Sequence, residues 1–156
     1  MSQPPPSGEW SAGPSPSGPS GPRADFWYRL GGLLIDAIIL GIAGNVIGLA
    51  FEGLYVSILI GLVVGIGYSV YFIGSPSGQT VGMKVLNIRV IDVGTSGPID
   101  YSRAAVRYLV SIVSGIPCYL GYFWMLWDPE KQTWHDKAAR TYVVPTSAYP
   151  VERWPG

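Results

Sequence analysis

The sequence predicts an all-α integral membrane protein, and three observations lead to that fold class. The chain has 156 residues, of which 48% are apolar and only 13% are charged, whereas a soluble domain carries roughly 25% charged residues. Long apolar runs cover residues 26–51, 54–73 and 108–127. Each run is about as long as a helix must be to cross the roughly 30 Å hydrocarbon core of a bilayer.

Charge and cysteine content exclude several classes of function. The 10 Lys and Arg residues balance the 10 Asp and Glu residues, so we expect no nucleic acid among the partners. One cysteine and one histidine exclude a disulfide framework and a Cys/His metal site. No nucleophile lies beside a base. We therefore expect no catalytic residues, no metal or other cofactor, and no enzyme activity.

The two ends of the chain differ from its apolar middle. Residues 1–22 hold seven of the 14 prolines with six serines and four glycines, a composition that buries too little apolar surface to offset the entropy of ordering. We expect a disordered tail there and a flexible tail over residues 146–156. Because the first segment lacks the charged start and short apolar core of a secretory signal, we expect the following apolar run to be retained.

The first two apolar runs predict an antiparallel helical hairpin. Residues 26–51 are apolar except for Arg29, Asp36 and Asn45, residues 54–73 carry no charge, and only a two-residue polar break separates the runs. Small residues at four-residue spacing favour close packing within the hairpin or between two copies. These small residues are Ala37, Gly41, Gly44, Gly48, Gly61 and Gly65.

The third run, residues 108–127, is interrupted by Pro117. Because proline removes a backbone donor, we expect a kink or two half-helices there. The run has the length of one span, which favours three crossings over a re-entrant segment. A helix should lead into the run from near Asp100, which is a suitable cap.

Basic residues predict the orientation of the chain. The link between the first two runs has none, whereas four lie between the second and third. The positive-inside rule therefore places that long link and the amino terminus in the cytoplasm of a multi-pass plasma-membrane protein. Three crossings would leave the carboxyl-terminal tail outside, in conflict with the three basic residues at its start. The four basic residues of the link are Lys84, Arg89, Arg103 and Arg107.

Asp36 is the residue that least suits a lipid environment. It lies about 15 Å along the first predicted helix, near the bilayer midplane, where a charge costs at least about 2.5–3.5 kcal/mol. Asp36 is therefore a candidate for a functional site. The alternative is that it forms a buried hydrogen bond or ion pair that holds helices in register. Arg29 shares its helix face but leans away from it, so each needs another partner. Candidates are Arg103 or Arg107 for Asp36, and Asp92 or Asp136 for Arg29.

Two polar segments complete the pattern. The link contains Gly78-Gln79-Thr80-Val81-Gly82-Met83-Lys84, which lacks the Gly-Lys-Ser/Thr step of a phosphate loop. Residues 85–92 are rich in β-branched side chains and fit a short strand or an interfacial segment. Near the carboxyl end, His135 and Asp136 belong to a charged patch that predicts an interfacial ion-pair cluster.

Together these residues resemble the RDD family of small bacterial membrane proteins, named for one arginine and two aspartates. Arg29 matches the arginine of this pattern and Asp36 matches its first aspartate. Asp136 matches the second aspartate, with Asp92 as the alternative assignment. The resemblance spans residues 23–145, and the Pro-rich head is similar to tails of actinobacterial members. It also covers the Gly78–Lys84 motif, residues 89–92, Arg107, residues 132–137 and Thr141; Arg140 departs from the family's usual glycine.

The resemblance implies an integral membrane domain that is suspected of transporting an unidentified ligand. Three spans are too few for a pathway within one monomer, so we expect a homo-oligomer or a larger membrane complex in the lipid bilayer. The alternative is a non-catalytic scaffold or accessory subunit that docks partners through the link and the Pro-rich tail. The ligand or ion site would combine Arg29, Asp36, Arg107 and Asp136, supported by Asp92, Arg89, Gln79, Thr80 and His135.

Overall fold

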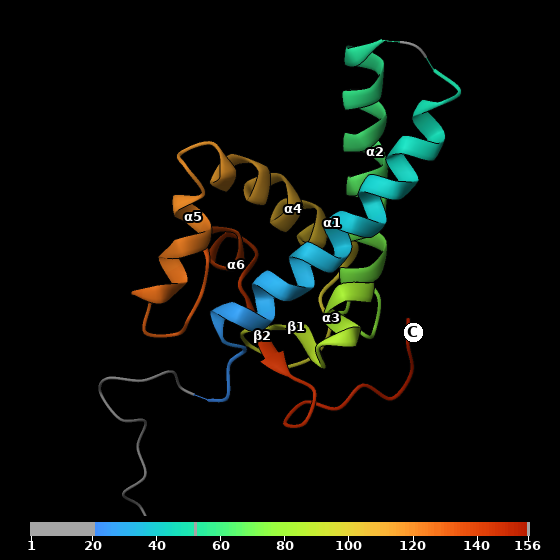
Figure 1. Ribbon diagram of the computed structural model, residues 1–156. Coiled ribbons are helices and arrows are strands. Elements are labelled where there is room, and N and C mark those ends of the chain that lie inside the picture. Colours follow the sequence, from blue (N-terminus) through green and yellow to red (C-terminus); the bar gives the residue numbers. More distant parts are fainter. Residues whose placement is uncertain (1–20, 52, 156) are drawn as a thin grey trace, which may run out of the picture.

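The computed structural model describes residues 21–51 and 53–155. The predicted disordered tail therefore lies outside the described residues, apart from its last two positions. Within the described part the protein is mostly helical (Figure 1).

Two long apolar helices form the hairpin that the sequence predicts. Helix α1 covers Phe26–Gly48 and helix α2 covers Leu54–Ile73. Both are long and apolar enough to cross a membrane, and little of either is buried within the protein. Figure 1 shows that their connected ends extend away from the other elements. Lipid would therefore cover exposed apolar side chains such as Leu34, Ile38, Ile42, Leu54, Leu59 and Val63.

Packing of the hairpin does not use most of the small residues. A Cβ added at Gly41, Gly44, Gly48 or Gly61 would meet nothing within 4 Å in the described structure. At Gly65 it would lie 2.3 Å from the hydroxyl oxygen of Tyr108. This last glycine therefore allows helix α4, which covers Tyr101–Gly115, to approach α2 closely.

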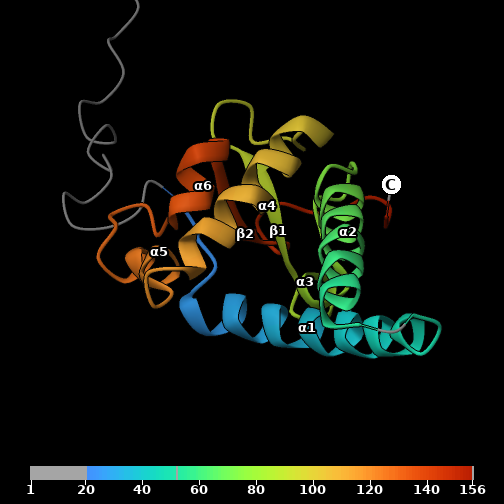
Figure 2. The same cartoon turned by 90° about the horizontal axis from the view of Figure 1, so that it is seen from above.

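A small layer of two short helices and two strands lies at the end of the hairpin where α1 begins. It contains α3 (Val81–Val85), β1 (Ile88–Asp92), α6 (Trp134–Ala139) and β2 (Thr141–Pro145). The strands pair antiparallel, with Ile88 opposite Pro145, and they lie side by side in both views (Figures 1 and 2). The backbone N–H of Ala24 donates to the carbonyl of Val143 at 2.8 Å, which ties the start of α1 to β2.

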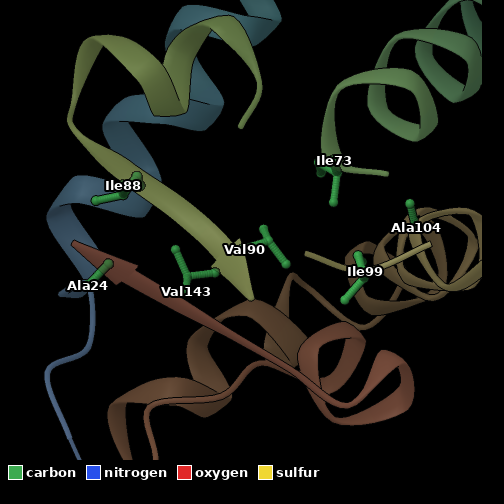
Figure 3. Packing of buried hydrophobic residues seen from close by; sticks show 7 residues of the cluster. All are labelled: Ala24, Ile73, Ile88, Val90, Ile99, Ala104 and Val143. Atoms are coloured by element: carbon green, nitrogen blue, oxygen red, sulfur yellow. The ribbon is translucent and has the colours of Figure 1, made fainter. Parts of the chain in front are cut away.

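This sheet corrects the expectation of an all-α fold to a mostly helical one. The sequence predicts β1 as one of two alternatives, but it does not predict β2. Both strands are largely buried, and their β-branched residues suit a pleated, packed surface. The main buried apolar cluster joins the sheet to the ends of α2 and α4 (Figure 3). Its members are Ala24, Ile73, Ile88, Val90, Ile99, Ala104 and Val143.

The third apolar run is bent sharply in the structure. Helix α4 covers Tyr101–Gly115, α5 covers Leu120–Phe123 and the 3₁₀ helix η1 covers Trp124–Leu126. The axes before and after the break differ by 112°, so residues 108–127 do not form one straight span. Pro117 lies in this break. At the other end of α4, Asp100 caps the helix by accepting a hydrogen bond from the Arg103 N–H at 2.8 Å.

Residues 146–155, for which the sequence predicts a flexible tail, make specific contacts with the end of α2 and with the link. The Trp154 ring stacks on Phe72 with centroids 5.3 Å apart, and its Nε1 donates to the carbonyl of Gln79 at 3.2 Å. Arg89 donates to the carbonyls of Pro150 at 2.8 Å and Pro76 at 2.9 Å. A buried guanidinium requires acceptors of this kind, and the final segment supplies one of them.

Candidate functional site

Asp136 joins three separate helices through its carboxylate. It is 0% exposed and accepts a hydrogen bond from Arg107 Nη2 in α4 at 2.6 Å. Its other oxygen accepts from Arg29 in the first turn of α1, so of the two carboxylates expected for Arg29, Asp92 and Asp136, the structure selects Asp136. That oxygen also accepts from the Thr133 N–H at 3.1 Å, as part of the capping box that starts α6. We call Arg29, Arg107 and Asp136 the arginine–aspartate cluster.

The electrostatics of the cluster keep Asp136 ionised. Burial alone would raise the pKa of this carboxyl, but the positive charges of Arg29 and Arg107 lower it well below its usual range. Two guanidinium groups and one carboxylate leave a net charge of about +1 among these three residues. His135 adds no further charge near neutral pH, because burial lowers its pKa to about 3.

Asp36 is held by three hydrogen-bond donors. The Tyr68 hydroxyl donates to Oδ1 at 2.7 Å, the Thr80 hydroxyl to Oδ2 at 2.6 Å, and the Gly82 N–H to Oδ1 at 2.8 Å. Within residues 21–51 and 53–155 it forms no ion pair. We call Asp36, Tyr68, Thr80 and Gly82 the Asp36 site.

The expectation that Arg103 or Arg107 would pair with Asp36 is wrong. Arg107 pairs with Asp136, and Arg103 pairs with Asp92 at 2.5 Å and donates to the carbonyl of Ala139. The physical reason is that Asp36 faces α3, where hydroxyl and amide donors can satisfy it without a cation.

The glycine motif of the link builds the Asp36 site. Thr80 caps α3 by accepting a hydrogen bond from the Met83 N–H at 3.2 Å, while its own hydroxyl donates to Asp36. Gly82 lies so close to α1 that an added Cβ would be 2.2 Å from the carbonyl oxygen of Gly32. Gly78 has φ +61°, in the left-handed region that glycine tolerates best. The motif therefore serves packing and hydrogen bonding between α3 and α1.

A cavity of about 860 Å³ lies between α1, α2, α4 and α5. Arg29, Arg107, His135 and Asp36 all contribute to its wall. The volume falls in the range of roughly 300–1,000 Å³ that is typical of small-molecule sites. The remaining wall is largely apolar and includes Leu30, Leu33, Leu40, Ile112, Ile116 and Phe123.

The other predicted site residues lie apart from this cavity, except for Thr80. Gln79 donates to the carbonyl of Ile88 at 2.8 Å, and Arg89 donates to the carbonyls of Pro76 and Pro150. Asp92 pairs with Arg103 and accepts from the Thr95 N–H at 2.9 Å. Although slight burial alone would raise the pKa of Asp92, these contacts lower it to about 2. The arginine–aspartate cluster therefore contains Asp136 and does not contain Asp92.

Sequence reasoning missed Tyr68 as a member of the site. Its hydroxyl donates a hydrogen bond to Asp36 and accepts one from the Val81 N–H at 3.1 Å. The sequence did contain a signal for Tyr68, because its hydroxyl lies within an apolar run that carries no charge. A tyrosine placed away from the ends of a span needs a hydrogen-bond partner.

The fold and the site together define a class of protein, namely mostly helical membrane proteins with a buried arginine–aspartate cluster. The family model of the RDD family matches residues 23–140. The chain therefore belongs to this family.

Relatives of this chain occur in mycobacteria. It is 34% identical over 84 residues to the "Proline-rich antigen homolog" of Mycobacterium tuberculosis, in strains CDC 1551 / Oshkosh and H37Rv, covering 52% of this chain and 35% of that protein. It is 33% identical over 69 residues to the "Proline-rich antigen" of Mycobacterium leprae strain TN, covering 44% and 28%. The match thus spans about a third of the length of these curated relatives. No solved structure matches the chain.

Proposed function

We propose that this RDD family membrane protein transports a small ligand or ion across the plasma membrane and carries out no catalysis. The observation that supports this function best is the cavity of about 860 Å³ with Asp36 in its wall. Asp36 lies near the middle of α1, a candidate span. A carboxylate in the cavity wall, on a candidate span and held by hydroxyl and amide donors, can take up and release a proton or small cation.

We propose that transport requires an assembly of several copies or a larger membrane complex. Two candidate spans and one bent segment are too few to enclose a pathway within one monomer. The exposed apolar faces of α1 and α2, with open space beside Gly41, Gly44 and Gly48, leave room for close helix packing with a neighbour in the bilayer.

For the topology we propose two crossings and a re-entrant α4–α5 segment in place of three crossings. The 112° bend supports this arrangement. So does the pairing of β1, from the link, with β2, which follows α6. Both strands lie at the end of the hairpin where α1 begins. This topology places the amino terminus, the link and the carboxyl-terminal segment together in the cytoplasm, in agreement with the positive-inside rule.

Reporter fusions test this topology. A green fluorescent protein fused after Gly156 should fluoresce, and an alkaline phosphatase fused there should be inactive, because both would lie in the cytoplasm. The matched control is the same pair of reporters fused after Phe51, between α1 and α2, where the pattern should reverse. Phosphatase activity at the carboxyl terminus would contradict the re-entrant segment and support three crossings.

Proteoliposomes test the role of Asp36. The full chain is reconstituted with a trapped pH-sensitive dye, and a Na⁺ or K⁺ gradient is applied. We expect dye-reported flux from the wild-type protein and its loss in Asp36→Asn. The amide cannot exchange a proton, yet its carbonyl can accept from Tyr68 and Gly82 while its NH₂ group donates to the Thr80 hydroxyl. The site should therefore keep its shape and lose only its charge.

The matched control for this experiment is Asp92→Asn. This change also removes one carboxylate, but at a position outside the cavity. Flux should be retained in the control. Equal flux from the wild-type and Asp36→Asn proteins would contradict the role that we assign to Asp36.

A non-catalytic scaffold or accessory subunit is the second candidate function. It is favoured by the hydrogen bonds of Asp36, which connect α1 to α2 and α3 and would suit a purely structural residue. Absence of flux from the wild-type protein, together with a stoichiometric partner that co-purifies and is lost when residues 1–22 are deleted, would support this function over transport.

A further inference from the structure

We propose that the cavity binds a single-chain anionic amphiphile taken from the membrane, with its carboxylate or phosphate head at the arginine–aspartate cluster and its chain along α1. This inference rests on the proposed function only in taking the same cavity as the ligand site, and it names the ligand class of that cavity. Four observations support it: the charge of the cluster, its unused donors, the shape of the apolar wall and the character of the rim.

The charge and unused donors of the cluster favour an anionic head. Arg29 and Arg107 share one carboxylate, which leaves a positive charge at the wall of the cavity. Among the described residues, Arg107 donates a hydrogen bond only from Nη2. Also among the described residues, Nε of Arg29, Nε of Arg107 and Nδ1 of His135 are buried without a hydrogen-bond partner. Guanidinium groups form their strongest hydrogen bonds with carboxylate and phosphate oxygens.

Asp36 does not compete for the head of such a ligand. It lies seven residues beyond Arg29, which is about 10 Å along the helix axis. Its two carboxylate oxygens already accept hydrogen bonds from the hydroxyls of Tyr68 and Thr80. The positive end of the cavity is therefore at Arg29 and Arg107.

The apolar wall extends from the cluster toward the middle of the membrane. Leu33, Ala37 and Leu40 follow Arg29 on successive turns of α1 and all line the cavity. The distance from Arg29 to Leu40 along the helix is about 16 Å. This is close to half of the roughly 30 Å hydrocarbon core. An acyl chain with its head at the interface would occupy the same depth in one leaflet.

The rim of the cavity indicates that the ligand enters from lipid. Leu33, Ile112, Ile116 and Phe123 line the cavity and are also exposed on the outside of the protein. In a bilayer, exposed apolar side chains of α1 and α4 face acyl chains. A free phosphate would have to cross this apolar rim, whereas a membrane amphiphile could enter sideways.

Binding of labelled oleate to the full-length protein tests the proposal. The protein is held in nanodiscs of zwitterionic phospholipid, and competitors displace the oleate. Oleoyl lysophosphatidic acid should compete well. Monooleoylglycerol, which has the same chain and a neutral head, should compete at least about tenfold more weakly, since a charge-assisted hydrogen bond contributes affinity of that order. Inorganic phosphate should not compete. Equal competition by the neutral and anionic lipids, or displacement by inorganic phosphate, would overturn the proposal.

A matched pair of variants locates the site. Ile112→Trp fills the apolar part of the cavity without touching the cluster and should abolish oleate binding. Ile58→Trp makes the same change at an exposed position of α2 outside the cavity and should leave binding unchanged. Unchanged binding in Ile112→Trp would also overturn the proposal. If that variant does not fold, Leu33→Trp serves the same purpose from α1.

The outcomes of this test are separable from those of the flux experiment. Oleate binding that depends on the head group and on Ile112, in a protein that shows no flux, would retain this inference and reject transport. Flux without selective oleate binding would reject this inference alone.

Discussion

Asp136→Asn is expected to destabilise the protein by about 3–5 kcal/mol, the cost of removing one partner from a buried ion pair. The change leaves two guanidinium groups facing a neutral amide that is itself buried, since Asp136 is 0% exposed. It also weakens the capping box of α6, because the side chain that accepts from the Thr133 N–H loses its charge. The links between α1, α4 and α6 should loosen together.

Thermal or denaturant unfolding in detergent measures this loss, and the abundance of the protein in membranes gives a second readout. Asp25→Asn is the matched control, because Asp25 also pairs with a cation, Lys131, but is largely exposed. An exposed pair contributes roughly 0–1 kcal/mol, so the control should unfold close to the wild-type protein. Similar stability of Asp136→Asn and Asp25→Asn would contradict the structural importance of the cluster.

Gly82→Ala is the second change with a large expected effect. The added Cβ would lie 2.2 Å from the carbonyl oxygen of Gly32 and 3.0 Å from the carboxyl group of Asp36. The first of these contacts is with backbone, so α3 would have to move away from α1 and the hydrogen bond from the Gly82 N–H to Asp36 would lengthen. Overpacking of this kind costs about 1–3 kcal/mol, to which the weakened hydrogen bond adds.

Unfolding measurements again test the prediction, with Gly67→Ala as the control. Gly67 lies in α2, and an added Cβ there would meet nothing within 4 Å. Because alanine favours a helix over glycine by roughly 0.5–1 kcal/mol, the control should be as stable as the wild-type protein or slightly more so. A Gly82→Ala protein that also keeps its stability would show that α3 does not depend on close contact with α1.

Much of the membrane architecture was predictable from local patterns. Residues 26–51 and 54–73 are recognisable as spans because the length of an apolar run and the thickness of the bilayer are directly comparable. The seven-residue spacing of Arg29 and Asp36 predicted one shared helix face, and the lean of helical side chains toward the amino terminus disfavoured a direct pair between them. The break near Pro117 was also predictable, because a proline within a helix removes a hydrogen bond wherever the chain folds.

The partners of these residues were less predictable, because they come from distant parts of the chain. Asp136 lies 107 positions after Arg29, and several carboxylates were equally plausible by charge. Asp36 is held by two hydroxyls and one backbone N–H. Since every residue except proline has such an N–H, composition does not identify the one that reaches the carboxylate. The strand β2 escaped prediction because its β-branched residues acquire a partner only when α6 returns the chain to β1.

The sequence by itself determined that this protein belongs in a membrane, which two helices are long and apolar enough to cross it, and which charged residues stand where lipid would penalise them. These properties follow from hydrophobicity, helix length and charge, and each is read within a single segment. The tertiary structure alone decided that Arg29 and Arg107 share Asp136, that Asp36 takes uncharged donors, and that a cavity separates α1 from α4. These properties depend on how segments far apart in the chain pack against one another, which local physical preferences do not specify.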